Sequence, residues 1–106
     1  MLDMEAWHLN YSLKYNQELL EEQLELLSKA REQLKRHYGE LNIRSKAWSA
    51  RLYIDYLEKN FIPDTEETIE AIRQMIEINK LQLTGLSYEE AHAQLNKGGQ
   101  QIELFW

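Results

Sequence analysis

Two of the three histidines each follow a glutamate by three residues, as Glu5/His8 and Glu89/His92. Residues i and i+3 share a face of an α-helix, so each pair can present one carboxylate and one imidazole to the same metal ion. The two pairs lie at opposite ends of the chain, however, and glutamate supplies 15 of the 106 residues. The spacing is therefore a weak indication of a metal site.

This Glu-x-x-His spacing resembles the one that ferritin-like di-metal bundles use twice, together with two further glutamates on other helices. The resemblance implies a helical bundle that binds iron, manganese or zinc. No further glutamate on a clearly apolar helix face completes the set in this chain. A metal-binding bundle is consequently our third interpretation, and we assign no metal ligand and no cofactor.

Positive charge and aromatic side chains gather in the middle of the chain. Residues 29–51 contain seven lysines and arginines against two glutamates, a local balance of +5 in a chain of net charge −6. These cations can neutralise the chain's own acidic helices, meet an acidic protein, or, with neighbouring aromatic rings, bind nucleic acid. A pI near 5.0 argues against nucleic acid as the main ligand. The candidate partner-binding cations are Lys35, Arg36, Arg44, Lys46 and Arg51.

The segment Gly85–Leu95, with the sequence GLSYEEAHAQL, resembles the first helix of many helix-turn-helix DNA-binding proteins. The resemblance covers about a tenth of the chain and implies that a basic recognition helix follows. His92 stands where such proteins usually have a small residue, and the chain continues as Asn96-Lys97-Gly98-Gly99 towards an acidic and aromatic end. We therefore interpret the segment as an ordinary capped helix.

Several classes of function lack their usual residues here. The chain has no cysteine, no glycine-rich phosphate loop and no serine with a recognisable nucleophile turn or neighbouring base. We therefore predict that it is not an enzyme. It also shows no long apolar run and no charged-then-apolar leader, so we expect no membrane span and a cytoplasmic location.

Five leucines recur every seven residues through the most charged part of the chain. A seven-residue apolar repeat keeps one face of an α-helix apolar over several turns, and such a face must be covered by another helix. The apolar stripe is about 140° wide, which suits a helix with two neighbours rather than a two-stranded zipper. The repeat consists of Leu13, Leu20, Leu27, Leu34 and Leu41, with Leu24 beside it.

Other helix signals divide the rest of the chain. Good helix formers dominate, with 17 leucines and no valine, which predicts an all-α protein. The pair Ile62-Pro63 is expected to end the second helix, after which Asp64 and Glu67 form a capping-box pattern that Ser87 and Glu90 repeat before the fourth helix.

Steps of three and four residues predict the inner face of the second helix, which Trp48 and Leu52 widen, and that of the third helix, which Met75 helps. The predicted inner residues are Ala47, Ala50, Ile54, Leu57 and Phe61 on the second helix and Ile69, Ile72, Ile76 and Leu83 on the third. We predict an antiparallel bundle of three main helices and a short fourth, with the bounds 1–39, 44–61, 64–84 and 87–97, followed by an apolar tail at 100–106.

The length of the first helix predicts self-association. About 36 helical residues measure about 54 Å, whereas a compact domain of this size is roughly 34 Å across. The later helices are each too short to cover such a helix, so we expect a second copy to cover the rest in a two-fold homodimer. The predicted self-association residues are Leu13, Leu20, Leu24, Leu27 and Leu34.

These features together favour a small, non-catalytic, intracellular helical protein that binds another protein as an adaptor, inhibitor or regulator. The expected contact surfaces are the basic cations named above and the apolar C-terminal residues Phe105 and Trp106. The alternative function is a nucleic-acid-binding regulator that uses the basic zone 29–51.

Overall fold

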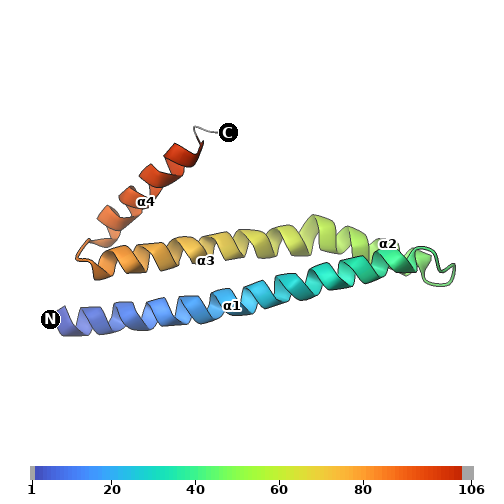
Figure 1. Cartoon of the computed structure of the whole chain (residues 1–106), viewed down its shortest axis with the longest axis horizontal. Coiled ribbons are helices and arrows are strands. Elements are labelled where there is room, and N and C mark those ends of the chain that lie inside the picture. Colours follow the sequence, from blue (N-terminus) through green and yellow to red (C-terminus); the bar gives the residue numbers. More distant parts are fainter. Residues whose placement is uncertain (1, 104–106) are drawn as a thin grey trace. The chain divides into compact units, whose positions relative to one another are not determined.

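The computed structural model describes the backbone of residues 2–103 and the side chains of residues 6–96. Within residues 2–103 the chain forms only helices and the turns between them, which confirms the all-α prediction (Figure 1). The elements are α1 (Leu2–Glu40), α2 (Ala47–Tyr56), the π-helical segment η1 (Leu57–Phe61), α3 (Ile62–Leu83) and α4 (Tyr88–Glu103). They form two compact units, with residues 1–19 and 71–106 in unit 1 and residues 20–70 in unit 2.

In unit 2, α1 runs antiparallel to α2, η1 and the start of α3 (Figure 1). Arg31 donates a hydrogen bond to Glu66, whereas Tyr38, further along α1, donates to Glu58. The residue numbers of the contacting side chains thus increase along α1 while they decrease along the opposite helices, as in any antiparallel pair. Most buried residues of this unit are apolar, with Thr65 of α3 as a buried polar residue: Leu27, Ala30, Ala50, Ile54, Leu57 and Ile69 form the apolar seam.

In unit 1, the first part of α1 runs antiparallel to the last part of α3. Here the seam contains a polar group, because Asn79 is only 3% exposed. Its Oδ1 accepts hydrogen bonds from Ser12 Oγ at 3.2 Å and from Asn16 Nδ2 at 2.9 Å. Ile72 and Ile76 supply the apolar part of the same α3 face.

Pro63 does not end the second helix as predicted. Helical structure continues without a break from Ala47 to Leu83, and Pro63 stands at the second residue of α3. Within a continuous helix, proline lacks the N–H donor and its ring crowds the carbonyl four residues back, so the helix must widen there. The preceding π-helical turn carries the junction: the N–H of Ile62 bonds to the carbonyl of Leu57, five residues back. Asp64 therefore lies inside a helix and caps nothing, and its carbonyl accepts from Thr68 Oγ1.

The predicted start of α4 is confirmed in atomic detail. Ser87 Oγ accepts from the backbone N–H of Glu90 at 3.2 Å, and the Glu90 carboxylate accepts from the Ser87 N–H at 3.0 Å. This reciprocal pair is a capping box. Gly85 supplies the turn that precedes it, with φ at +108°, a conformation that side chains disfavour. The end was predicted less well, because α4 continues through Gly98 and Gly99 to Glu103.

The leucine row meets the chain's own helices in each unit. Leu27 is buried, and Leu13, Leu20 and Leu34 are half-buried, whereas Leu24 remains exposed. The unbroken helical stretch from Ala47 to Leu83 is nearly as long as α1. The length of α1 therefore gives no reason to invoke a second copy, and the predicted homodimer needs other support.

Ile78 is a core residue that the predicted stripe of α3 did not include. It is buried although it lies two positions from Ile76 and so projects to the opposite side of α3. Within unit 1, Figure 1 draws the start of α4 on the side of α3 away from α1. Ala91 of α4 is fully buried. We attribute both burials to the packing of α4 on this second face of α3.

Candidate functional site

Three large side chains form an exposed ridge on α2. Trp48, Leu52 and Tyr56 are spaced by four residues and are 75%, 54% and 51% exposed. The opposite face of α2 carries buried Ala50 and Ile54. The expectation that Trp48 and Leu52 widen the inner face was therefore wrong, because helical periodicity turns them away from α1. We call these three residues the α2 ridge.

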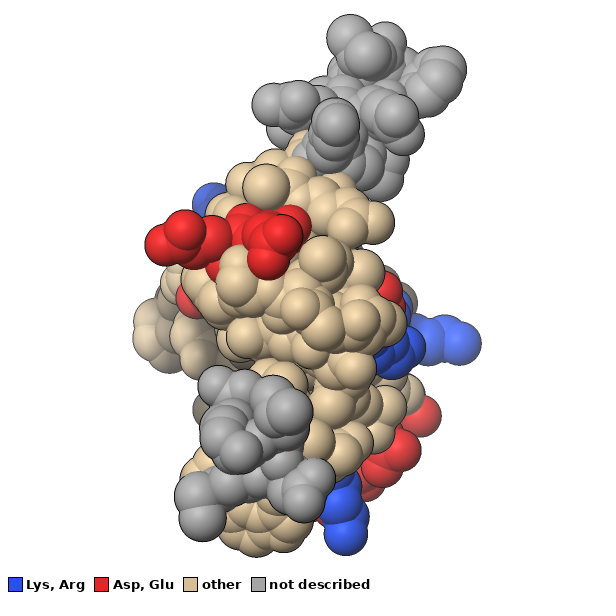
Figure 2. Space-filling model, turned by 90° about the vertical axis from the view of Figure 1, so that its left-hand side faces the viewer, with Lys and Arg blue, Asp and Glu red and all other residues tan. Residues whose placement is uncertain are grey.

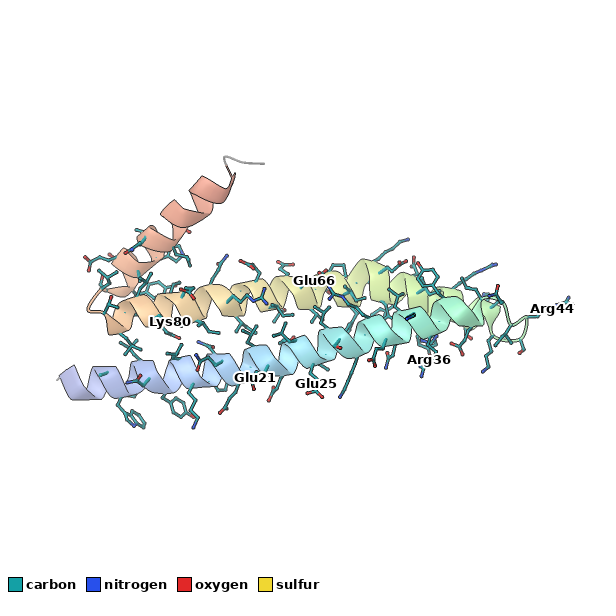
Figure 3. The ribbon with its side chains drawn as sticks, in the orientation of Figure 1. Glu21, Glu25, Arg36, Arg44, Glu66 and Lys80 are labelled. Atoms are coloured by element: carbon teal, nitrogen blue, oxygen red, sulfur yellow. The ribbon has the colours of Figure 1, made fainter. Side chains whose placement is uncertain are left out.

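Two arginines border the α2 ridge without an ion-pair partner. Among the described residues, no salt bridge engages Arg51, which lies between Trp48 and Leu52 in sequence, or Arg44 in the preceding turn. Figure 3 shows Arg44 projecting from that turn, away from the helices. These two guanidinium groups are free to meet carboxylates of a partner.

A network of polar contacts holds the turn against α2. The imidazole of His37 stacks on Tyr53 with ring centroids 4.9 Å apart, and its Nδ1 lies 2.7 Å from the Glu40 carboxylate. The hydrogen bond to His37 lowers the pKa of Glu40, and Lys46, 3.7 Å away, lowers it further. These contacts join the last turn of α1 to α2, so the α2 ridge rests on a fixed support.

Acidic groups lie on α2 and η1 as well. Asp55 pairs with Lys59 at 2.7 Å, and the hydrogen bond raises the pKa of that lysine. The phenol of Tyr38 donates to Glu58 at 2.6 Å, which raises the pKa of Tyr38. The surface around the α2 ridge therefore carries both signs of charge rather than a uniformly basic field.

The predicted basic zone is divided between two elements. Arg44, Lys46 and Arg51 lie in the turn and on α2, whereas Lys35 and Arg36 lie on α1. Figure 3 shows Arg36 projecting from the side of α1 that faces away from α3. Lys35 borders a shallow hollow of about 350 Å³ on α1, whose other lining residues are Leu24, Leu27, Ser28, Arg31 and Glu32. Arg44, Lys46 and Arg51 therefore share the helix of the α2 ridge and the turn before it, whereas Lys35 and Arg36 do not.

The Glu-x-x-His pairs do not meet in a metal site within the described side chains. No group of three or more His, Asp and Glu residues there is arranged to hold a metal ion. His92 Nδ1 lies 3.0 Å from Asn96 Nδ2, its partner one turn along α4. The side chain of Glu5 and the predicted contact residues Phe105 and Trp106 lie outside the described residues.

A second exposed aromatic row lies on α1 in unit 1. Trp7, Tyr11 and Tyr15 are also spaced by four residues and exposed, and the rings of Trp7 and Tyr11 stack with centroids 5.8 Å apart. The leucine repeat of α1 gave no indication of this row. The four-residue spacing of large aromatic residues opposite those leucines is the signal that could have identified it.

Unit 1 also contains a surface hollow of about 710 Å³ where α1 begins and α3 turns into α4. Leu9, Leu83 and Leu86 supply its apolar lining, and His8 and Tyr88 are among its polar residues. Figure 2 looks onto this end and shows a broad area without charged side chains beside a group of acidic ones. The Glu90 carboxylate at this hollow accepts a hydrogen bond from the Ser87 N–H.

The described part of α4 does not support the resemblance to helix-turn-helix proteins. Such a motif needs a turn and a second helix after the first. Here α4 continues as one helix from Tyr88 to Glu103.

No helix in the described residues combines the length and the apolar character needed to span a bilayer. No protein-family model, curated protein or solved structure matches the chain.

Proposed function

We propose that this chain is a non-catalytic, cytoplasmic protein-binding module with an antiparallel helical bundle arrangement, which docks the α2 ridge into a groove of another protein. The single observation that carries the proposal is the outward exposure of Trp48, Leu52 and Tyr56 along one face of α2. Water-exposed large apolar side chains in a continuous row mark interaction surfaces on proteins.

The residue types of the α2 ridge and its border support a protein partner. Trp, Tyr and Arg are the residues most enriched among those that dominate binding energy in protein interfaces. Trp48, Tyr56 and Arg51 supply all three on a single helix. A helix that places apolar side chains at four-residue intervals is also the form in which many partners insert into apolar grooves.

The support beneath the α2 ridge favours tight binding. Binding costs free energy for every side chain and segment that must become ordered. Here the ridge stands on a formed helix whose inner face is buried, and the stack of His37 on Tyr53 holds the turn that precedes it. Docking therefore requires little further ordering of the helix that carries the ridge.

Nucleic acid is the second candidate, because no salt bridge among the described residues engages Arg44 or Arg51, and α2 exposes aromatic rings. Asp55 and Glu58 lie on the same helical stretch and repel phosphates. We therefore rank a protein partner first. Affinity for single-stranded RNA or duplex DNA that falls steeply with salt would favour the second candidate.

The proposal is tested by site-specific crosslinking in the native cell. A photoreactive phenylalanine analogue replaces Tyr56 on the α2 ridge in one variant and Tyr11 on α1 in the matched control, since both tyrosines are exposed. We expect a discrete protein adduct from position 56 that position 11 does not give. The purified adduct partner should then bind wild type at least about tenfold more tightly than Trp48→Ala in calorimetry.

Two outcomes contradict the proposal. One is the absence of any protein adduct at position 56 under conditions where position 11 forms one. The other is a partner whose affinity is unchanged by both Trp48→Ala and Leu52→Ala. Either result removes the α2 ridge as the docking surface.

A further inference from the structure

The surface hollow of unit 1 lies where α1, the end of α3 and the start of α4 meet. Leu9 of α1, Leu83 of α3 and Leu86 of the turn before α4 line it with half-buried apolar side chains. Its volume of about 710 Å³ falls within the range of roughly 300–1,000 Å³ that is usual for small-molecule pockets. The hollow therefore has the size and the apolar lining of a binding site for a small molecule.

Backbone hydrogen bonds fix the turn that forms one wall of the hollow. The N–H of Leu86 bonds to the carbonyl of Leu81 at 3.4 Å. The N–H of Gly85 bonds to the carbonyl of Gln82 at 3.0 Å. These two bonds form a Schellman motif, which ends α3. Because the capping box of α4 follows directly, this wall is ordered before a ligand binds, which lowers the cost of binding.

The acidic groups at the hollow select the charge of the ligand. Among its lining residues, Glu90 is the carboxylate, and no lysine or arginine is present. The hydrogen bond from the Ser87 N–H lowers the pKa of Glu90, so this carboxylate is ionised at neutral pH. Glu89 adds a second carboxylate in the first turn of α4. Two carboxylates outweigh the roughly half positive charge that a helix carries at its N-terminus.

The basic residues near the hollow do not cancel this negative charge. Lys80, one turn before Leu83 on α3, forms a salt bridge of 3.6 Å with Glu77. His8 lines the hollow and repels a cation only when its imidazole is protonated. The hollow therefore favours a positively charged ligand over a negatively charged one.

Tyr88 supplies an aromatic ring that suits a cationic ligand. The ring lines the hollow, is 50% exposed and packs at a tilt against His92 with ring centroids 5.9 Å apart. A cationic nitrogen over the face of an aromatic ring is attracted by the quadrupole of the ring. A carboxylate and an aromatic ring at an apolar hollow are together suited to an organic ammonium ion.

We propose that the hollow of unit 1 binds a small amphiphilic amine. The apolar chain of the amine contacts Leu9, Leu83 and Leu86. Its ammonium group lies beside the Glu90 carboxylate and the Tyr88 ring. This site shares no residue with the α2 ridge, so it stands or falls independently of the protein-binding function.

Three eight-carbon probes that differ only in their head group test the proposal. Amide NMR titrations of the full chain compare octylammonium, octanol and octanoate at about pH 8, where an ordinary imidazole is neutral. We expect octylammonium to bind at least about tenfold more tightly than octanoate, with octanol between them. Equal affinities for the two ions, or no saturable binding of octylammonium up to about 5 mM, overturn the proposal.

The variants Glu90→Gln and Glu89→Gln form a matched pair that tests the charge. Glutamine preserves the capping box at position 90, so α4 still begins at the same place. Glu90→Gln should weaken octylammonium binding about tenfold and leave octanol binding unchanged, because only the charge is lost. Glu89→Gln should weaken it less than about threefold, since Glu89 does not line the hollow. An octylammonium affinity that is equal in wild type and Glu90→Gln overturns the proposal.

The variants Ala6→Phe and Ala93→Phe test the location. Both alanines are exposed on helices of unit 1, and of the two only Ala6 lines the hollow. A phenyl ring at position 6 fills part of the hollow, so Ala6→Phe should weaken octylammonium binding at least about tenfold and Ala93→Phe should not. In wild type the amide signals of Leu9 and Leu86 should shift most. Unchanged binding in Ala6→Phe, or shifts confined to the α2 ridge, place the amine elsewhere and overturn the proposal.

Discussion

The seams of the two units hold α1 by different means. In unit 2 the buried residues are apolar except for Thr65, and Leu27, Ile54 and Leu57 are among them. In unit 1 the side chain of Asn79 is buried in the seam and accepts hydrogen bonds from Ser12 and Asn16. Apolar contacts stabilise without direction, whereas hydrogen bonds require specific partners at specific places.

This difference indicates that the two seams contribute differently to stability and to the register of α1 against α3. A leucine repeat can slide by a whole number of turns against another apolar stripe at modest cost. Ser12 and Asn16 stand one turn apart on α1, and both donate to the same oxygen of Asn79. A shift of one turn moves one of the two donors away from Asn79, so a half-buried polar group loses its acceptor, which is costly. We infer that unit 2 supplies most of the stability and that unit 1 determines the register.

The largest expected effect is on the apolar seam of unit 2. Leu27→Ala should lower the free energy of unfolding by about 2–5 kcal/mol, because it removes a buried side chain and leaves a cavity. Leu24→Ala is the matched control and should cost about 1 kcal/mol, since 39% of this leucine stays exposed to water. Urea unfolding followed by circular dichroism measures both. Equal losses for the two variants contradict the assignment of Leu27 to the seam.

A smaller effect is expected in the polar seam of unit 1. Asn79→Ala should cost about 1–3 kcal/mol, because Ser12 and Asn16 lose their acceptor. Asn79→Leu should retain more stability than Asn79→Ala, since it refills the space with apolar atoms. Its amide NMR spectrum should nevertheless show additional peaks for α1 and α3 as the helices sample other registers. A single sharp set of peaks in Asn79→Leu contradicts the proposed role in register.

The sequence predicted the buried apolar residues of these seams better than it predicted where the helices end. Periodicity identified Ala50, Ile54 and Leu57 as the inner face of α2 because burial on one side is what a helical repeat records. It did not predict the continuous helix through Pro63, which depends on a π-helical turn at η1. The periodicity of apolar residues does not signal such a turn, although Pro63 directly follows it.

The candidate site shows the same limit. Sequence reasoning selected Trp48, Arg44 and Arg51 as notable residues, but it placed Trp48 in the core because aromatic residues at helical spacing are usually buried. Which side of a short helix faces inward depends on the helix it meets, and a two-sided apolar helix such as α2 fits either assignment. Only the buried positions of Ala50 and Ile54 decide between them.

The two units also differ in how the start of a helix is capped. In unit 1, Ser87 caps α4, whereas in unit 2, Lys46 precedes α2 without a side-chain cap. Ser87→Ala should therefore destabilise α4 by about 1 kcal/mol, seen as faster hydrogen exchange of its first amides. Ser49→Ala is the control, because the Ser49 hydroxyl only donates to the Lys46 carbonyl, and it should change stability by less than about 0.5 kcal/mol.

The smallest expected effect concerns two carboxyl groups, one in each unit. Hydrogen bonds lower the pKa of Glu40 and of Glu90 below the ordinary value of 4.5. Each carboxylate therefore adds stability that is fully present above pH 4.5 and is lost as pH falls through the lowered pKa of the folded state. The causes differ, because Glu40 depends on the His37 side chain and Glu90 depends first on the Ser87 backbone N–H.

These causes predict that the two pKa values respond to mutation by different amounts. His37→Gln should return the pKa of Glu40 most of the way towards 4.5, with only the nearby cations Lys46 and Arg36 still lowering it. Ser87→Ala should return the pKa of Glu90 only part of the way, since alanine keeps the backbone donor. Carboxyl carbon NMR titration of both variants measures the two values in one experiment. If Ser87→Ala moved Glu90 fully while His37→Gln left Glu40 unchanged, the backbone and side-chain roles would be the reverse of those assigned to the two units.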